Sequence, residues 1–282
     1  MNKSEVLKGF DPVMERDHII AWLRDWFDAQ DPSGSKHAVI GISGGKDSTI
    51  AAALLARAIG PDRVLGVLLP NGHQSDLDDA KAVIDALAIP SVMINIGPIV
   101  AHIYASVIRA VIPKDVDFQM SSDSMINTPP RVRMTVLRNL AQSSYGNGFV
   151  INTCNRSETY IGYSTKDGDG TGDVSPLGAY LVSEIVAIGR TMPEIPEYLV
   201  VKAPADGLCG HTDEDRFGFT YAELDQYLCY MDREWVETDQ QHRKIGLLSP
   251  FPHRTQILSM HKASAHKRNP MPVCPKCCNH VA

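Results

Sequence analysis

The segment that decides the fold reads Ala38-Val39-Ile40-Gly41-Ile42-Ser43-Gly44-Gly45-Lys46-Asp47-Ser48-Thr49. Its first residues are small or β-prone and predict a buried strand, and the Ser-Gly-Gly turn lets the backbone take positive φ or approach a ligand closely. An alanine-rich run over residues 50–59 follows and stops at Gly60-Pro61, which predicts a helix. A strand, a tight loop and a helix therefore follow one another directly.

The N-terminus of this helix predicts an anion-binding loop. Free N–H groups and the positive end of the helix dipole favour a pyrophosphate there, and the hydroxyl groups of Ser48 and Thr49 add neutral donors. Asp47 does not suit a site that binds anions alone, so a divalent cation is expected between its carboxylate and the phosphates. The simplest alternative is a Gly-Gly turn followed by an ordinary Ser/Asp helix cap.

The spacing of this loop distinguishes it from other phosphate-binding loops. A Walker loop has four residues between its first glycine and Gly-Lys-Ser/Thr, and a dinucleotide fingerprint reads G-x-G-x-x-G. Residues 43–48 match neither pattern. They read S-G-G-x-D-S, which resembles the signature of PP-loop ATP pyrophosphatases, and this resemblance implies that ATP is cleaved between its α and β phosphates.

Length and composition predict a soluble, cytoplasmic enzyme. The chain has 282 residues, a formal net charge of −6 and 44% hydrophobic residues, which suits one large α/β domain or two small ones. No run reaches membrane-spanning length, and no signal-peptide pattern starts the chain. The acidic balance argues against a nucleic-acid partner, and six scattered cysteines do not form a secreted disulfide framework.

Apolar periodicity beyond the loop predicts a parallel sheet. Residues 11–27 predict a packing helix, strands are predicted at 64–69, 91–96 and 149–152, and helices at 76–87, 99–111, 131–145 and 177–190. Residues 115–130 and 155–173 predict loops, the second at the active site. This alternation predicts an α/β fold with a Rossmann-like, doubly wound parallel sheet and helices on both faces. A single domain over residues 1–282 is expected, with a C-terminal tail over about 270–282.

Motifs beyond residue 120 resemble those of ammonia-dependent NAD synthetase and occur in the same order. Asn127 with Pro130-Arg131-Val132-Arg133-Met134 is similar to the family's N-x-x-A-R-x-R-M helix start. Four more segments carry the match, namely residues 150–158, 162–169, 173–177 and 212–214 with Gly218 and Thr220-Tyr221. With Leu69-Pro70 before them and His266-Lys267-Arg268 after them, the resemblance covers most of the chain and implies the adenine-nucleotide α-hydrolase fold.

The resemblance implies a reaction that makes an amide from the nicotinic-acid carboxylate of deamido-NAD. The carboxylate would attack the α-phosphorus of ATP to give an acyl adenylate and pyrophosphate, and ammonia would then displace AMP to give NAD. Charge accumulates on phosphate oxygens in the first step, so Mg²⁺ and a donor-lined loop are expected. Asp47 and Glu158 are the expected catalytic residues and metal ligands, because each follows a predicted strand and both can meet at one edge of the sheet.

The resemblance also implies binding residues and partners. ATP is expected to bind the loop and the end of a later strand through Gly41, Ile42, Ser43, Gly44, Gly45, Lys46, Asp47, Ser48 and Thr153. Four cations and one carboxylate are expected to hold deamido-NAD, namely Arg131, Lys166, Asp173, His266 and Lys267. The family's dinucleotide lies across a subunit interface, which implies a homodimer. The chain has no room for a glutaminase domain, so ammonia is expected to be free or delivered by a partner.

Four positions depart from the family pattern. Val182 aligns with a lysine that contacts ATP, Ala205 with a hydroxyl residue near the nucleotide, Leu68 with an arginine and Asn152 with a glycine. Each lost charge-assisted hydrogen bond is expected to cost about 1–3 kcal/mol of ATP binding or adenylation. Lys46, at the variable position of the loop, is a candidate for compensation, and the hypothesis is a divergent but active synthetase.

Two other functions stay open at this point. A PP-loop enzyme that thiolates tRNA would account for the ATP loop and the cysteines, although the acidic charge and the presence of Cys154 alone near the site fit it poorly. The substitutions at Val182 and Ala205 would also fit a catalytically inactive nucleotide sensor. The tail residues Cys274, Cys277, Cys278 and His280 predict either zinc ligands or, as the favoured interpretation, a mobile tail with reduced thiols.

Overall fold

The computed structural model describes residues 6–72, 76–110, 118–145, 147–202, 212–234 and 251–268. Ala205 and the tail residues Cys274, Cys277, Cys278 and His280 lie outside these ranges, so what the sequence predicts for them stays a prediction. The strands are β1 (His37–Gly41), β2 (Val64–Leu68), β3 (Ser91–Met93) and β4 (Gly148–Val150).

The helices are spread over the whole described chain. They are α2 (Pro12–Gln30), α3 (Lys46–Ile59), the short 3₁₀ turn η1 (Pro61–Arg63), α4 (Leu77–Leu87), α5 (Gly97–Ile108), α6 (Ser122–Ala141), α7 (Arg156–Ile161), α8 (Val182–Gly189), α9 (Glu197–Val200), α10 (Asp213–Phe217), α11 (Tyr221–Glu234), α13 (Arg254–Ala263) and α14 (Ala265–Arg268). None of those within the described ranges is long and apolar enough to cross a membrane.

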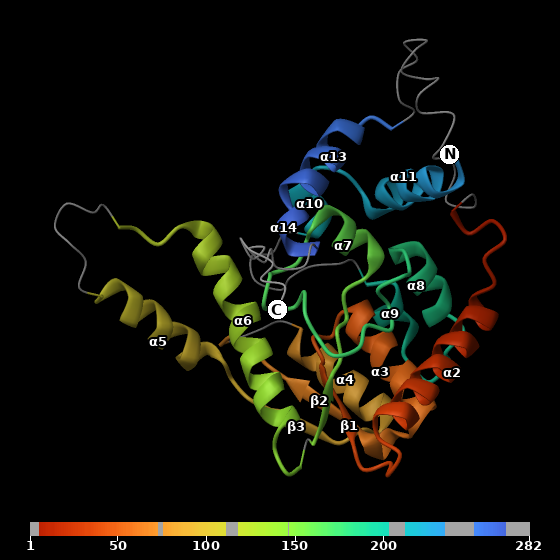
Figure 1. Ribbon diagram of the computed structural model, residues 1–282, viewed down its shortest axis with the longest axis horizontal. Coiled ribbons are helices and arrows are strands. Elements are labelled where there is room, and N and C mark those ends of the chain that lie inside the picture. Colours follow the sequence, from red (N-terminus) through yellow and green to blue (C-terminus); the bar gives the residue numbers. More distant parts are fainter. Residues whose placement is uncertain are drawn as a thin grey trace, which may run out of the picture.

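The strands form one parallel sheet in the order β3-β2-β1-β4. The central strand β1 pairs Ala38 with Val64 of β2 on one side and with Phe149 of β4 on the other. Helices connect consecutive strands, as parallel neighbours require (Figure 1). The chain winds from β1 out to β3 and then returns to the other side of β1. Such a reversal places the ligand site at the carboxyl ends of β1 and β4.

The two faces of β1 contribute to separate hydrophobic cores. Ala38 and Ile40 pack with residues of α2, α3, α8 and α9. Val39 packs on the opposite face, with Val100 of α5 and Leu137 of α6. Helices therefore cover both faces of the sheet, and the predicted doubly wound architecture is confirmed.

A third core joins the helices that follow the sheet. Ile161 of α7, Val182 of α8, Leu224 and Tyr227 of α11 and Ile257 of α13 are all buried in it. Figure 1 shows these helices together at one end of the molecule. Their packing fixes the position of α7 relative to α11, and the candidate site uses both helices.

Helix α6 starts inside the predicted loop 115–130, so that prediction is wrong for the described part of the segment after residue 121. The prediction rested on the Ser, Asp and Pro content of the segment, and Pro129 and Pro130 have no N–H group to continue a helix. Here a side chain supplies the missing donor: the hydroxyl of Tyr104 donates to the carbonyl oxygen of Met125, four residues before Pro129, at 2.7 Å. A tertiary contact thus satisfies the carbonyl oxygen that Pro129 leaves without its helical donor.

Other boundaries differ for local reasons. Helix α7 lies inside the predicted loop 155–173, because Asn155 and Glu158 form a capping box: each side chain accepts a hydrogen bond from the other's backbone N–H, at 2.9 and 3.2 Å. Strand β3 ends before residue 96, although the N–H of Ile94 still donates to Leu68 O at the end of β2 and the N–H of Ile96 donates to Pro70 O. Helix α8 begins at residue 182 rather than 177.

Gly44 is the residue that lets the loop after β1 pack onto α4. Its φ is +78°, and a Cβ atom there would lie 2.8 Å from the carbonyl oxygen of Asp76 and 2.9 Å from the nitrogen of Ala80. The ammonium of Lys202 spans this contact, donating to Asp76 Oδ1 at 3.0 Å and to Asp79 Oδ2 at 2.6 Å. Glycine is therefore required here by both conformation and space.

The Gly44→Ala variant is expected to lose about 2–4 kcal/mol of free energy of unfolding, because left-handed backbone strain and a backbone clash add together. Gly218→Ala is a matched control, since its φ is +75° but the nearest heavy atom to a Cβ lies 3.8 Å away. The control is expected to lose about 1–2 kcal/mol. Urea unfolding followed by circular dichroism measures both losses, and equal values would contradict the close contact at Gly44.

Candidate active site

A cavity of about 470 Å³ opens at the carboxyl ends of β1, β2 and β4. Its walls are the loop after β1, residues 67–70, one face of α6 and the segment after β4. Most of the residues predicted to bind ATP line it, namely Gly41, Ile42, Ser43, Gly45, Lys46, Asp47, Ser48 and Thr153, and Glu158 lines it as well. Gly44 is not among the lining residues, because it packs against α4 instead.

The loop after β1 is held in shape by its own hydroxyl groups. Ser43 Oγ accepts from the N–H of Gly45 at 3.2 Å and lies 3.1 Å from Ser48 Oγ. Thr49 Oγ1 donates to the carbonyl oxygen of Gly45 at 2.8 Å. No side chain of the described residues caps the N-terminus of α3. The first N–H groups of this helix are therefore available to an anion.

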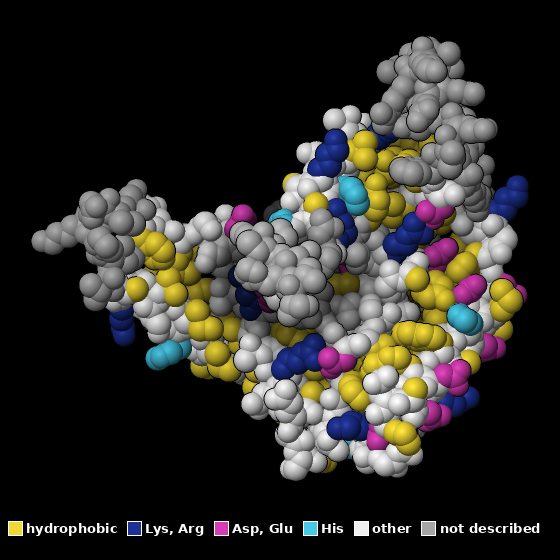
Figure 2. All heavy atoms as spheres, in the orientation of Figure 1, with side chains coloured by type: hydrophobic (Ala, Val, Ile, Leu, Met, Phe, Trp, Pro, Cys, Tyr) yellow, Lys and Arg dark blue, Asp and Glu magenta, His cyan; other side chains and the backbone are white. Residues whose placement is uncertain are grey.

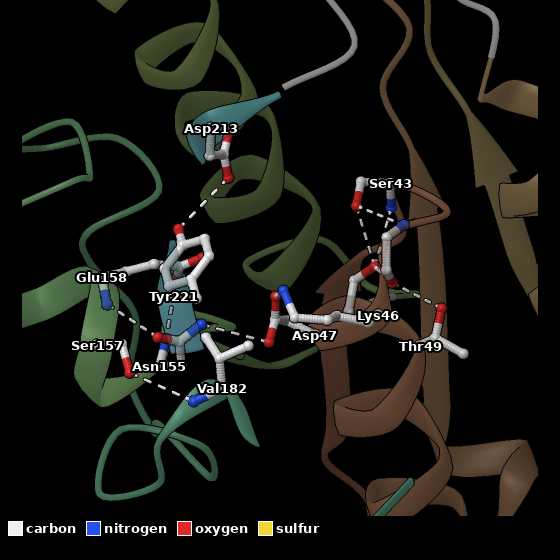
Figure 3. A network of polar contacts seen from close by, with 12 residues as sticks. Ser43, Lys46, Asp47, Thr49, Asn155, Ser157, Glu158, Val182, Asp213 and Tyr221 are labelled. Carbon is white, nitrogen blue, oxygen red and sulfur yellow. Dashed lines mark hydrogen bonds and ion pairs between the residues drawn. The ribbon is translucent and has the colours of Figure 1, made fainter. Parts of the chain in front are cut away.

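Asp47 and Glu158 come from different helices and meet in the cavity (Figure 3). Asp47 lies in the first turn of α3 and Glu158 in the first turn of α7. Asn155 Nδ2 donates to Asp47 Oδ1 at 3.4 Å and so links the two helix starts. Burial and the nearby charge of Asp47 raise the pKa of Glu158 to about 8. A proton or a cation must therefore accompany this carboxylate pair near neutral pH.

Lys46 and two tyrosines complete the surroundings of the pair. The Lys46 side chain is only 3% exposed, with Nζ 2.8 Å from Asp47 Oδ2 and 5.6 Å from the centre of the Tyr221 ring. The hydroxyls of Tyr221 and Tyr163 donate to Asp213 at 3.4 and 3.1 Å. We call Asp47, Glu158 and Asp213, with Lys46 and Tyr221, the acidic chamber.

The donors of the acidic chamber suit a hard divalent cation. Mg²⁺ is commonly held by one or two protein carboxylates and completes its shell with water and substrate phosphates. Asp47 and Glu158 provide such a pair beside an anion-binding helix start. In the described ranges no group of three or more His, Cys, Asp or Glu residues is placed to hold a metal ion. The protein would therefore supply part of the shell and the nucleotide the rest.

The Asn152 side chain links the segment after β4 to the loop over residues 169–175 by hydrogen bonds. Its Nδ2 donates to the carbonyl oxygens of Asp169 and Thr171 at 2.8 and 3.1 Å. Its Oδ1 accepts from the N–H of Cys154 and the hydroxyl of Ser175, both at 3.0 Å. A buried amide that makes four hydrogen bonds thus fixes one wall of the cavity, at a position where the family is expected to carry a glycine.

Cys154 lines the same wall. Burial, and then the charges of Glu158 and Asp169, raise the pKa of its thiol well above the usual range. The Sγ atom donates to the carbonyl oxygen of Asp169 at 3.2 Å. A protonated, hydrogen-bonded thiol is a poor nucleophile.

The cations expected to hold deamido-NAD lie at and beside the cavity. Lys267 lines it, but its ammonium donates to the carbonyl oxygens of Gly162 and Ser164 at 2.7 and 2.6 Å. Arg131, Lys166 and His266 are exposed and do not line the cavity. They adjoin one another, because Arg131 Nε donates to Lys166 O at 3.2 Å and Lys166 Nζ to His266 O at 3.5 Å.

Asp173 lies apart from these cations. Its carboxylate pairs with Arg138 of α6 at 2.5 Å and accepts from the N–H of Val150 at 2.7 Å. It is not among the residues that line the cavity. The structure therefore places this carboxylate at the end of β4, with its oxygens already used, and offers no support for its expected contact with the dinucleotide.

The sequence analysis missed several polar residues that line the cavity, namely Arg133, Lys202, Asp213 and Arg216. Arg131 and Arg133 are two positions apart on a helix and so point in different directions, which means that only one can face the site. Arg133 does so, with Nε donating to Leu69 O at 3.1 Å. Its spacing of three residues from Pro130 and four from Leu137, which both line the cavity, is a signal that could have identified it.

Val182 is buried at the start of α8 and belongs to the third core. Its N–H donates to Ser157 Oγ at 3.3 Å. Ser157 Oγ also donates to Asp225 Oδ1 at 2.6 Å. The aliphatic side chain at this position is therefore part of the hydrophobic packing beneath α7, where the family is expected to carry a lysine.

The sequence profile of the NAD synthase family matches residues 17–271. Among similar proteins, the NH(3)-dependent NAD(+) synthetase of Pyrococcus furiosus is 36% identical over 243 residues, covering 84% of this chain and 87% of that protein. The protein of the same name from Thermococcus kodakarensis is 40% identical over 197 residues, covering 70% and 73%.

Solved structures of similar enzymes match the fold of this chain. The NMN synthetase of Francisella tularensis superposes with a TM-score of 0.76 at 30% identity, covering 94% of this chain and 99% of that one. The NH3-dependent NAD synthetase of Campylobacter jejuni has a TM-score of 0.70 over 95% of this chain and 100% of that one, and at 23% identity it supports the fold. The phosphate loop, the carboxylate pair and these matches together show that the chain belongs to the NAD synthase family.

Proposed function

We propose that the chain catalyses the ATP-dependent amidation of deamido-NAD with ammonia, giving NAD, AMP and pyrophosphate. The observation that carries this proposal is the meeting of the phosphate loop with Asp47 and Glu158 in one cavity of a NAD synthase family member. An anion-binding helix start beside a carboxylate pair is the combination that nucleotide activation requires.

The first step joins the substrate to AMP. An oxygen of the nicotinic-acid carboxylate attacks the α-phosphorus, the bond from that phosphorus to the bridging oxygen breaks, and pyrophosphate leaves with the electron pair. The N–H groups at the start of α3 are the donors that would hold the phosphates. Asp47 and Glu158 would hold Mg²⁺, which when bound neutralises charge on the phosphate oxygens.

The second step forms the amide. Ammonia attacks the acyl carbon, the bond from that carbon to the AMP oxygen breaks, and one proton leaves the nitrogen. Glu158, whose buried carboxyl has a pKa raised to about 8 by desolvation and by the charge of Asp47, could take this proton only while no cation is bound to it. The cavity walls around Thr153 and Thr165 would restrict water that competes with ammonia.

The two alternative functions predict other products. Thiolation of tRNA needs a reactive cysteine, whereas the pKa of Cys154, the half-buried cysteine that lines the described cavity, is raised by desolvation and by the charges of Glu158 and Asp169, which disfavours the thiolate. A nucleotide sensor would bind ATP without turnover. Pyrophosphate release that depends on the deamidated substrate favours the synthetase, while release that depends on tRNA would favour the thiolating enzyme.

Asp47→Asn and Glu158→Gln are each expected to lower the rate of NAD formation by about 10²–10³-fold, because a charged ligand would be lost from the Mg²⁺ that would neutralise the phosphate charge. Asp78→Asn is the control, since the Asp78 side chain is 93% exposed. The assay measures NAD with ATP, deamido-NAD, ammonium and Mg²⁺ present. Full activity in either site variant would contradict the assigned roles.

A second candidate substrate is the mononucleotide, nicotinic acid mononucleotide. The observation in its favour is the likeness to the Francisella tularensis NMN synthetase, which covers 94% of this chain. The chemistry at the carboxylate is the same for both substrates, so the cavity residues that bind ATP do not distinguish them. The exposed cluster of Arg131, Lys166 and His266 would bear on the rest of the dinucleotide.

Lys166→Ala is expected to raise the KM for deamido-NAD by about tenfold, because the ammonium would contact the dinucleotide phosphates. The KM for ATP is expected to stay unchanged, since Lys166 does not line the cavity. Steady-state kinetics gives the KM for deamido-NAD and the KM for ATP. The same measurement with nicotinic acid mononucleotide compares the two candidate substrates. A preference of the unaltered protein for the mononucleotide would replace the proposed substrate with the second candidate.

We further propose that two copies of the chain form a homodimer through α5 and α6. In α5 only Val100 is buried, while Ile99, Ile103 and Ile108 are 42%, 37% and 69% exposed. Figure 1 shows α5 and the first part of α6 projecting from the body of the molecule, and Figure 2 shows hydrophobic side chains along this projection. An apolar surface of this kind favours a protein partner, and a second copy would also bring a second cluster of exposed cations.

Ile103→Asp is expected to convert the dimer to a monomer, because a carboxylate would be buried without a partner. Met14→Asp is the control, since Met14 of α2 is 60% exposed and lies outside the proposed interface. Light scattering coupled to gel filtration gives the mass of each. A monomeric unaltered protein, or a dimeric Ile103→Asp variant, would contradict the interface.

A further inference from the structure

The ion pair between Lys46 and Asp47 is local in the sequence and largely buried. The other local pairs among the described residues, Arg16 with Asp17 and Lys81 with Asp78, have exposed carboxylates. Lys46 and Asp47 are neighbours in the chain and both belong to the first turn of α3. Neighbouring side chains on a helix do not normally face one another. Here Lys46 Nζ nevertheless lies 2.8 Å from Asp47 Oδ2, with the two side chains 3% and 17% exposed. The pair therefore joins no two elements of the fold.

The pair of Lys202 with Asp76 and Asp79 shows the contrast. Lys202 follows α9, and its partners lie at the start of α4, so that contact ties distant segments together. An ion pair that joins two distant segments is explained by the stability it adds to the fold. The pair of Lys46 and Asp47 lies within one helix turn and joins no distant segments. The buried positive charge of Lys46 therefore needs another explanation.

That explanation lies in the charge of the acidic chamber. The Lys46 side chain lines the same cavity as the carboxylates of Asp47, Glu158 and Asp213, with its Nζ 2.8 Å from Asp47 Oδ2. The side chain is therefore a fixed positive charge among carboxylates, and its position over the Tyr221 ring adds a favourable cation–π contact. Figure 3 shows Lys46 and Asp47 together beside Tyr221.

We propose that Lys46 is a tethered counter-ion that occupies Asp47 in the nucleotide-free protein and competes there with the divalent cation. This inference rests on the proposed function, because it takes Asp47 as a metal ligand. The ammonium sits on a flexible four-carbon stem at the first residue of the helix. When a nucleotide enters, its phosphates offer this ammonium another partner, so the metal reaches Asp47 together with the nucleotide.

The test measures Mn²⁺ binding to the full chain without nucleotide, by the loss of the free-ion signal in electron paramagnetic resonance. Lys46→Met is expected to bind Mn²⁺ at least about tenfold more tightly than the unaltered protein, because the competing charge is gone and the carboxylates stay. Lys46→Arg, which keeps the charge, is expected to bind Mn²⁺ as weakly as the unaltered protein. The double variant Lys46→Met with Asp47→Asn is expected to lose the gain.

A matched control is Lys81→Met. Lys81 pairs with Asp78 at 3.1 Å, but the two side chains are 53% and 93% exposed, so its removal is expected to leave Mn²⁺ binding unchanged. If Lys46→Met is folded, an affinity for Mn²⁺ that is equal to or weaker than that of the unaltered protein overturns the proposal. If it unfolds without metal, refolding on addition of Mn²⁺ supports the proposal and failure to refold overturns it.

The result is independent of the reaction itself. An unaltered protein that makes no NAD in the assay above would overturn the proposed function. The comparison of Mn²⁺ affinities would still report whether Lys46 competes for Asp47. Conversely, equal affinities in an active enzyme would remove the role of Lys46 and leave the proposed reaction in place.

Discussion

Two carboxylates that meet in a buried chamber are the constraint around which the site is built. Asp47 and Glu158 cannot both stay ionised in a desolvated place unless a positive charge or a proton accompanies them. In the structure the Lys46 ammonium lies 2.8 Å from Asp47 Oδ2, and the Asn155 amide donates to Asp47 Oδ1. The remaining negative charge supports the proposal that the chamber takes a cation brought by a nucleotide.

The parallel sheet makes this meeting possible. Strands β1 and β4 are neighbours, so the chain segments that follow them leave the sheet at the same edge although they are distant in the sequence. Helix α7 is then held at its other end, where Lys267 donates to Gly162 O at 2.7 Å and Arg268 to Tyr160 O at 3.1 Å. The C-terminal helices therefore position Glu158 without touching it. Such preorganisation is what electrostatic catalysis requires.

The parts of this arrangement that local chemistry determines could be predicted from the sequence. The strand, glycine turn and helix around residues 38–59 and the convergence of Asp47 with Glu158 follow from residue pattern and sheet topology. The start of α6 could not be predicted, because the carbonyl oxygen that Pro129 leaves without a helical donor is satisfied by the hydroxyl of Tyr104 in another helix. The pairing of Asp173 with Arg138 could not be predicted either, because the order of the motifs does not show which side chains of other elements they contact. Partners of that kind exist only in the folded chain.

The central claim is that the substrate carboxylate attacks the α-phosphorus in the cavity beside Asp47. The most direct measurement uses deamido-NAD with ¹⁸O in its carboxylate, followed by mass spectrometry of the products. The account predicts that one ¹⁸O atom appears in AMP, because the oxygen that attacks phosphorus stays with it when ammonia displaces AMP. Label in pyrophosphate, or unlabelled AMP formed together with NAD, would contradict it.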